Sequence, residues 1–291
     1  MYLARLTKNV VDTAIKLEDL SEELRGYLGM SSLGHPCMRK LWYGFRLCGS
    51  DLPQQTARML RLFNRGHREE PYVYERLLAA GIKVLPVNPA TGKQFEYVGS
   101  YGHAKGHSDG LAYNIPDLPW RWVLLECKTH NDKNFTAVSN RGVKKAMATH
   151  YCQTQRYMER HRAQFPEYDV THTLYIGVNK NNDSWHTELI PYDAEAVDML
   201  INREMSVIET DVVPDRLNSD PNFFTCRFCD YNPMCHGGRD YPVHCRTCKN
   251  VAVCDGGIWK CEKPLNNDRL GPLTLADQLE GCGGYVKNFT L

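Results

Sequence analysis

The feature that most constrains the fold is a short apolar run that ends in two charges. Trp122-Val123-Leu124-Leu125 is followed directly by Glu126-Cys127-Lys128. Such a run predicts a buried strand. Residues i and i+2 of a strand share a face, so Glu126 and Lys128 should project to one side and Cys127 to the other. Because charges at the end of a buried strand are costly without partners, this strand predicts a sheet that carries a polar site.

The order of the expected elements predicts an α/β fold with a central mixed β-sheet flanked by helices. Helical patterns cover residues 1–30, 54–80, 133–163 (two helices) and 192–210, with Gly81 ending the second. Strand patterns cover residues 82–87, 94–98, 107–113, 121–128, 171–179 and 184–190. The first four strand patterns are bounded by Gly, Pro or Asn, which predicts a meander.

The composition changes after Pro221, where cysteine, glycine and proline rise and periodicity disappears. We therefore place boundaries near 220 and 241, with one domain over 1–240 and a cysteine-rich, metal-binding appendage over 241–291. Eight of the 12 cysteines follow residue 225. No signal-peptide pattern precedes them, so a cytoplasmic location and metal ligands, rather than disulfides, are expected.

The formal net charge of +1 excludes a basic field over the whole protein, but it allows a local basic groove. No run approaches the roughly 18 apolar residues of a membrane span, so no membrane association is expected.

A second motif brings another carboxylate near the charged strand end. Asp109, in Gly106-His107-Ser108-Asp109-Gly110, is expected on the preceding strand, beside Glu126 in a hairpin. Phosphodiester hydrolysis needs a divalent cation that polarises the phosphate and activates water. Asp109, Glu126 and the carbonyl of Cys127 would supply hard oxygens for magnesium or manganese. Lys128 would orient or deprotonate the water, or stabilise the transition state. Alone, each motif is more often a turn or a solvated strand end, and their combination along an apolar strand favours the functional interpretation.

Two helical motifs complete a longer pattern. Gly66-x3-Glu70 lies upstream and Gln153-x3-Tyr157 downstream. With these four motifs in order, residues 31–240 resemble the RecB-like branch of the PD-(D/E)xK nucleases. That branch includes phage recombination exonucleases and iron-sulfur nucleases of CRISPR adaptation.

The resemblance implies a restriction-endonuclease-like core and a DNA exonuclease of phage or mobile-element recombination. It adds Glu70 as a metal ligand, with Glu69 as its neighbouring alternative, and Gln153 as a catalytic residue. Tyr157 would contact DNA or support the site. Single- or double-stranded DNA and a recombination or replication protein are the implied partners. The alternatives are a structure-specific endonuclease of the same fold and a non-catalytic, DNA-binding metalloprotein scaffold.

The first cysteine cluster is Cys226-x2-Cys229-x5-Cys235. A short loop with three thiolates wraps a soft metal well and needs a fourth ligand. Cys37 is the candidate, and Cys48 is its near neighbour without the surrounding motif. The resemblance implies a [4Fe-4S] cluster held by Cys37, Cys226, Cys229 and Cys235, and zinc is the alternative because it accepts the same thiolates.

The second cluster predicts a small structural zinc module, because 241–291 has few apolar residues for a core of its own. Its expected ligands are Cys245, Cys248, Cys261 and Cys282, with Cys254 as the alternate.

A basic N-terminal third interleaved with aromatic residues is typical of a strand-binding groove, although for any one of these residues a solvated helix face is the more frequent explanation. Its members are Arg39, Lys40, Arg46, Arg58, Arg61, Arg65 and Arg68, with Trp42, Tyr43 and Phe45. Arg39, Arg65 and Tyr157 are the expected DNA contacts. His103, His107 and His130 are expected as polar neighbours of the site.

Overall fold

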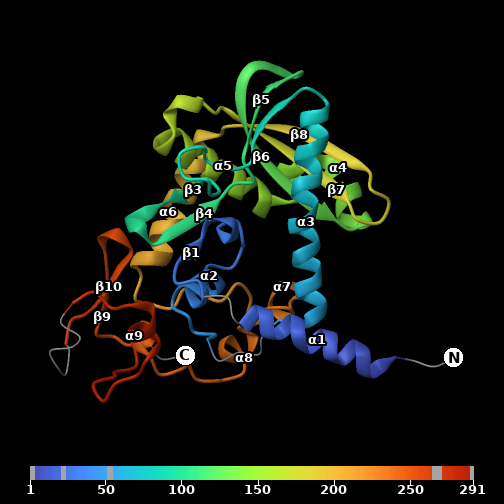
Figure 1. Ribbon diagram of the computed structural model, residues 1–291. Helices are drawn as coiled ribbons and strands as arrows, with labels where there is room; N and C mark the ends of the chain where they lie inside the picture. The colour runs from blue at the N-terminus through green and yellow to red at the C-terminus, as the bar shows by residue number, and fades with distance from the viewer. Residues whose placement is uncertain (1–3, 21–23, 51–54, 264–270, 289–291) are drawn as a thin grey trace.

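The computed structural model describes residues 4–20, 24–50, 55–263 and 271–288, and these form three sheets with helices around them (Figure 1). The helices are α1 Arg5–Leu20, α2 Met38–Phe45, α3 Ala57–Ala79, α4 Asp132–Ala146, α5 Ala148–Gln164, α6 Ala194–Glu209, α7 Phe224–Arg227, α8 Asn232–Cys235 and α9 Leu275–Leu279. The strands are β1 Leu28–Gly29, β2 Lys83–Leu85, β3 Glu96–Val98, β4 Ala104–His107, β5 Leu111–Ile115, β6 Leu118–His130, β7 His172–Asn179, β8 Trp185–Pro191, β9 Val251–Cys254 and β10 Ile258–Cys261.

The largest sheet has five strands in the order β2-β5-β6-β7-β8, and the expected central mixed sheet is confirmed. β6 and β7 run parallel, with Glu126 opposite Tyr175 and Lys128 opposite Gly177. The other pairs are antiparallel. The connection between β6 and β7 consists of α4 and α5, as a parallel pair requires a long crossover.

Alternation along β6 divides its side chains between two helical layers. Leu125 and Cys127 pack in one cluster with Val73 of α3. The opposite face carries Glu126 and Lys128 and is covered by α4 and α5, which contact the sheet. Figure 1 shows α3 running from the level of α1 up to that of the sheet. The sheet is therefore flanked by helices on both faces.

The expectation of one sheet with a four-strand meander is wrong. Residues 107–113 were expected as a single strand, but the chain breaks there into β4 and β5. β4 pairs with β1 and β3 in a three-stranded sheet, whereas β5 joins the large sheet. The break includes Gly110, whose φ of +111° favours glycine and whose added Cβ would lie 2.4 Å from the Leu85 carbonyl oxygen. Asp109 consequently lies in the connector between two sheets, not on a strand.

The helical expectations hold in most of the chain. The helices expected at 54–80, 133–163 and 192–210 appear as α3, α4 with α5, and α6. The helix expected over 1–30 is shorter, because α1 ends at Leu20 and Leu28–Gly29 forms β1. The parts of that expectation at 1–3 and 21–23 lie outside the described residues. No described helix is long and apolar enough to cross a membrane.

The cysteine-rich segment after 241 shares a core with the rest of the chain. Trp259 belongs to the same hydrophobic cluster as Trp42 and Phe45. Arg246 is 1% exposed and donates to the carbonyls of Phe45 and Gly26, both at 2.7 Å. The domain boundary at 241 stays a prediction. The packing described above joins the segments before and after that boundary in one core.

Replacing Arg246 tests that joint. Arg246→Ala leaves the buried Phe45 carbonyl and the partly buried Gly26 carbonyl without their donor, and we expect the free energy of unfolding to fall by about 3 kcal/mol. Denaturant unfolding measures the change. Arg216→Ala, at an exposed arginine, is the matched control and should change it by less than about 0.5 kcal/mol. Equal effects of the two variants would contradict the role of Arg246.

Candidate active site

Glu126 lies at the centre of the site and is fully buried. Its Oε1 accepts a hydrogen bond from Gln153 Nε2 of α5 at 2.8 Å and forms an ion pair with Lys128 Nζ. Its Oε2 is buried and has no hydrogen-bond partner among the residues that the structure describes. Buried carboxylate oxygens are normally satisfied, so this oxygen marks an open position for a donor or a cation.

Asp109 is held beside β6 by backbone contacts. Its Oδ2 accepts from the Cys127 N–H at 2.7 Å, and its carbonyl accepts from the Tyr74 hydroxyl at 2.8 Å. The register between β5 and β6 ends at Leu111 and Leu124, so β6 continues past its partner. The N–H and C=O of one strand residue point to the same edge. The Cys127 carbonyl therefore points toward the edge where Asp109 lies.

Glu70 approaches the same place from α3. Burial and the charge of Asp109 raise the pKa of Glu70 above its usual range, while His67 and Lys128 oppose the shift. The His67 Nδ1 lies 3.6 Å from a Glu70 carboxylate oxygen. The structure thus brings Glu70 to the carboxylates expected from the sequence.

The electrostatics of the cluster favour an added positive charge. Burial and the charge of Asp109, opposed by Lys128, together raise the pKa of Glu126 to about 8. Burial also raises the pKa of Asp109. For Lys128, burial lowers the pKa, but the charges of Glu126 and Asp109 outweigh it and raise the pKa. Carboxylates that repel one another in this way are stabilised by a bound cation.

The donor set fits a hard cation. Within the described ranges, no group of three or more His, Cys, Asp or Glu side chains is arranged so that it could hold a metal ion. Magnesium is bound by one or two carboxylates with waters and substrate phosphates. The unpartnered Glu126 Oε2, the Asp109 carboxylate and the Cys127 carbonyl match that smaller requirement.

Tyr157 supports the strand that leads to Asp109. It is 3% exposed, and a Cβ added at Gly106 would lie 2.4 Å from its ring. The ring therefore rests on the backbone of β4, and only glycine at 106 allows that approach. Gly106 and Tyr157 belong to different sequence motifs but form one contact.

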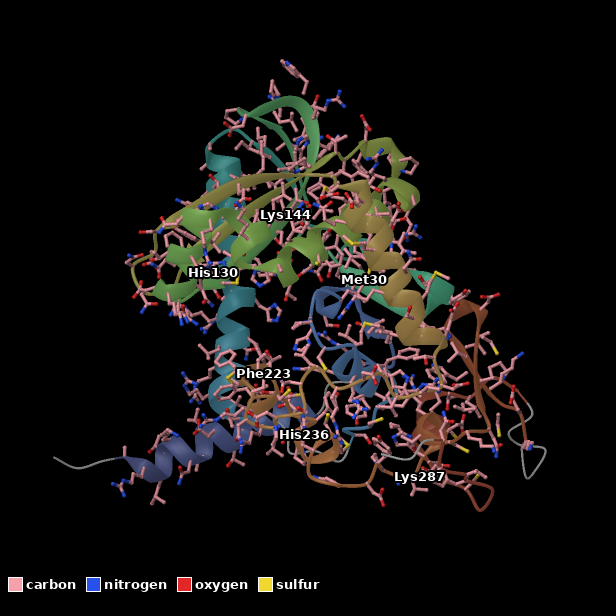
Figure 2. The ribbon with its side chains drawn as sticks, turned by 180° about the vertical axis from the view of Figure 1, so that it is seen from behind. Met30, His130, Lys144, Phe223, His236 and Lys287 are labelled. Atoms are coloured by element: carbon pink, nitrogen blue, oxygen red, sulfur yellow. The ribbon has the colours of Figure 1, made fainter. Side chains whose placement is uncertain are left out.

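The four cysteines expected to bind iron and sulfur line a single pocket, together with His35 and His236. These are Cys37, Cys226, Cys229 and Cys235. Among the described residues, no carboxylate lines the pocket, and Arg39 Nη1 donates to Cys235 Sγ at 3.6 Å. A set of thiols without carboxylates has the ligand chemistry of a thiolate-binding metal, although within the described ranges these thiols are not gathered into a group that could hold one. In Figure 2, His236 lies in the lower part of the molecule and His130 in the sheet-bearing part, so the two sites are separate.

In the second cluster, Cys248 Sγ accepts from the backbone N–H groups of Asn250 at 3.5 Å and Val286 at 3.4 Å. Such donors stabilise a thiolate. Cys261 pairs with Val251 at the end of the β9–β10 hairpin that follows Cys248, whereas Cys254 lies at its turn. This geometry favours Cys261 over Cys254 as a partner of Cys248.

The aromatic part of the expected strand-binding groove is wrong. Trp42, Tyr43 and Phe45 are at most 1% exposed and lie in the main core cluster, so they offer no face to a base. Arg46 is equally buried and pairs with Asp211.

The other residues expected to touch DNA have contacts within the protein. Arg39 donates to the Pro214 carbonyl at 2.6 Å, and Arg65 to the Lys180 carbonyl at 2.8 Å. Their role toward DNA stays a prediction. His103 lies away from the site, bonded to the Cys254 carbonyl, and His107 contacts Glu96.

Three residues near the site were missed from the sequence. Tyr74 follows Glu70 by one helical turn, and His150 precedes Gln153 by one, so helical spacing points to both. Tyr175 has no such signal, because only the register of β7 places it opposite Glu126.

Neither a protein-family model nor a curated protein matches the chain. Among solved structures, the chain is similar to that of SSO0001, with 13% identity and a TM-score of 0.43 over 80% of this chain and 96% of that one. An alkaline exonuclease (LHK-Exo) from Laribacter hongkongensis is 16% identical, with a TM-score of 0.39 over 62% of this chain and 86% of that one. Its complex with dAMP gives 13% and 0.39 over the same shares. Similarities this low assign neither a family nor an activity.

Proposed function

We propose that the protein is a metal-dependent nuclease of the PD-(D/E)xK type that hydrolyses phosphodiester bonds in DNA. The observation that carries the proposal is the unpartnered, buried Oε2 of Glu126, in a cluster that also contains Asp109 and Lys128. A structural ion pair would use both oxygens of such a carboxylate. An oxygen left open beside a second carboxylate is the arrangement that a hard cation needs.

Glu70, Asp109, Glu126 and the Cys127 carbonyl would hold magnesium or manganese. The ion, when bound, supplies charge that polarises the phosphate and lowers the pKa of water. Gln153 donates a hydrogen bond to Oε1 of Glu126. This bond keeps Oε2 of Glu126 turned to the site. Lys128, partly exposed at 27%, can reach a substrate phosphate and stabilise the negative charge that develops on it.

We further propose digestion from DNA ends, in a phage or mobile-element recombination pathway in the cytoplasm, as the sequence resemblance implies. Endonucleolytic cutting and DNA binding without catalysis are the alternatives. Linear and covalently closed circular DNA separate them: an exonuclease degrades only the linear form, and an endonuclease also cuts the circle.

Removing the site carboxylates tests catalysis. Glu126→Gln and Asp109→Asn keep the shape of the side chains but remove the charge that binds the cation. We expect each to lower the rate of hydrolysis of end-labelled DNA by at least about 100-fold, and Lys128→Ala to do the same. Chelation of divalent ions should stop the wild-type enzyme.

The matched control is Glu75→Gln, at an exposed position of the same helix as Glu70, and it should retain full activity. Melting temperatures verify that each variant is folded. A folded Glu126→Gln variant that degrades DNA at the wild-type rate would show that the site lies elsewhere.

We also propose that Cys37, Cys226, Cys229 and Cys235 hold a [4Fe-4S] cluster. Protein purified without oxygen should be brown, with absorbance at about 400 nm. Cys37→Ala should remove the colour and the iron. Cys48→Ala is the control, because Cys48 is buried outside the pocket and burial raises its pKa, which keeps it a neutral thiol. Colourless protein with zinc and no iron would contradict the cluster and leave the nuclease proposal standing.

Cys245, Cys248, Cys261 and Cys282 are proposed as a zinc site. Cys261→Ser and Cys282→Ser should each release about one zinc ion per chain and make residues 241–291 sensitive to protease. Cys254→Ser should do neither, because Cys254 lies at the far end of the hairpin. Metal analysis of the three variants decides, and loss of zinc from Cys254→Ser alone would reverse the assignment.

A further inference from the structure

A chain of three polar side chains continues the site along the sheet. His130 follows Glu126 and Lys128 on the same face of β6, since all three are spaced by two residues. Tyr175 of β7 lies opposite Glu126. Its hydroxyl is 2.8 Å from His130 Nε2 and 2.8 Å from His150 Nδ1 of α5. One hydroxyl therefore joins β6, β7 and α5.

The chain is built into the core. Tyr175 is fully buried and His130 is 3% exposed. The rings of His150 and Tyr175 stack with centroids 6.0 Å apart. A Cβ added at Gly177 would lie 3.2 Å from the His130 ring, so glycine at 177 makes room for this arrangement. Buried polar side chains that bond to one another in this way hold the elements they join in one geometry.

Both imidazoles are neutral, which defines the hydrogen bonds. Burial and the charge of Lys128 lower the pKa of His130 to about 4 and that of His150 to about 3. A hydroxyl donates one hydrogen and accepts others. Tyr175 can therefore donate to one neutral ring and accept the N–H of the other, so both ring nitrogens that face the hydroxyl are bonded to it.

The hydrogen bond between His150 and Tyr175 is linked to the Glu126 carboxylate through α5. His150 and Gln153 are one helical turn apart and lie on the same face of α5. The hydrogen bond between His150 and Tyr175 therefore fixes the position of α5 along and around its axis. This places Gln153, which donates to Glu126 Oε1.

We propose that Tyr175 is a positioning residue for the proposed nuclease site: by joining His130 to His150 it holds Gln153 on Glu126 and leaves Glu126 Oε2 open for the cation. This inference rests on the proposed function. It assigns no direct contact with substrate to Tyr175.

Tyr175→Phe removes the hydroxyl and keeps the ring. We expect kcat to fall about 10–100-fold, as for other residues that orient metal ligands. KM for DNA should stay unchanged, and more magnesium should be needed for half-maximal activity. His150→Asn places a polar atom where Nδ1 lies and should restore much of the activity lost in His150→Leu.

The matched control is Tyr151→Phe. Tyr151 is on the same helix, and its hydroxyl donates to Asp193 at 2.6 Å, away from Glu126. Its loss should leave kcat and the magnesium requirement near wild type. Equal losses of kcat in Tyr151→Phe and Tyr175→Phe would show that both residues only anchor α5, and this would overturn the inference. A Tyr175→Phe enzyme with wild-type kcat would also overturn it.

Manganese affinity, measured by calorimetry on the same proteins, separates this inference from the proposed function. Weaker manganese binding in Tyr175→Phe than in wild type supports the inference, even if the wild type cuts no DNA. A wild type that binds manganese without cutting contradicts the proposed function alone. Unchanged manganese affinity in Tyr175→Phe contradicts the inference alone, and a wild type that binds no manganese contradicts both.

Discussion

The buried carboxylate of Glu126 is the constraint on which the site depends. Moving such a charge out of water costs several kcal/mol, and an ion pair alone seldom offsets it. Lys128 and Gln153 both bond to Oε1, so one oxygen is compensated and the other is not. The fold accepts a partly satisfied charge at the middle of its largest sheet. Proteins retain such local conflicts where they serve a function.

The sheet accommodates that charge because β5 and β6 separate. The register of β5 with β6 ends at Leu124, with one further bond from the Leu125 N–H to the Gly110 carbonyl at 2.9 Å, and the preceding strand β4 belongs to another sheet. The edge of β6 that would otherwise bond to a strand instead bonds to the Asp109 side chain through the Cys127 N–H. Because the chain changes sheet at Ser108–Gly110, β5 does not extend to Cys127, and the side chain of Asp109 bonds to the edge of β6 at that point.

Local patterns in the sequence predicted what depends on local chemistry. The alternation in β6 was sufficient to choose Glu126 and Lys128, whereas Glu70 and Gln153 were chosen only through the resemblance to a nuclease family. The break after His107 was missed because residues 107–113 have the composition of one strand, and the local sequence does not show that Leu85 lies where a Cβ at position 110 would be. Tyr175 was missed because register between parallel strands is a tertiary property. Trp42 was misplaced because an amphipathic segment does not reveal what covers its apolar face.

The contact between Gly106 and Tyr157 has a consequence for how such a sequence can vary. The ring occupies the place that a side chain at 106 would take, so substitution at either position alone leaves a clash or a void. A larger residue at 106 becomes acceptable only together with a small one at 157. The two positions, 51 residues apart in the sequence, therefore act as a coupled pair, and a double substitution that exchanges volume between them should be milder than either single change.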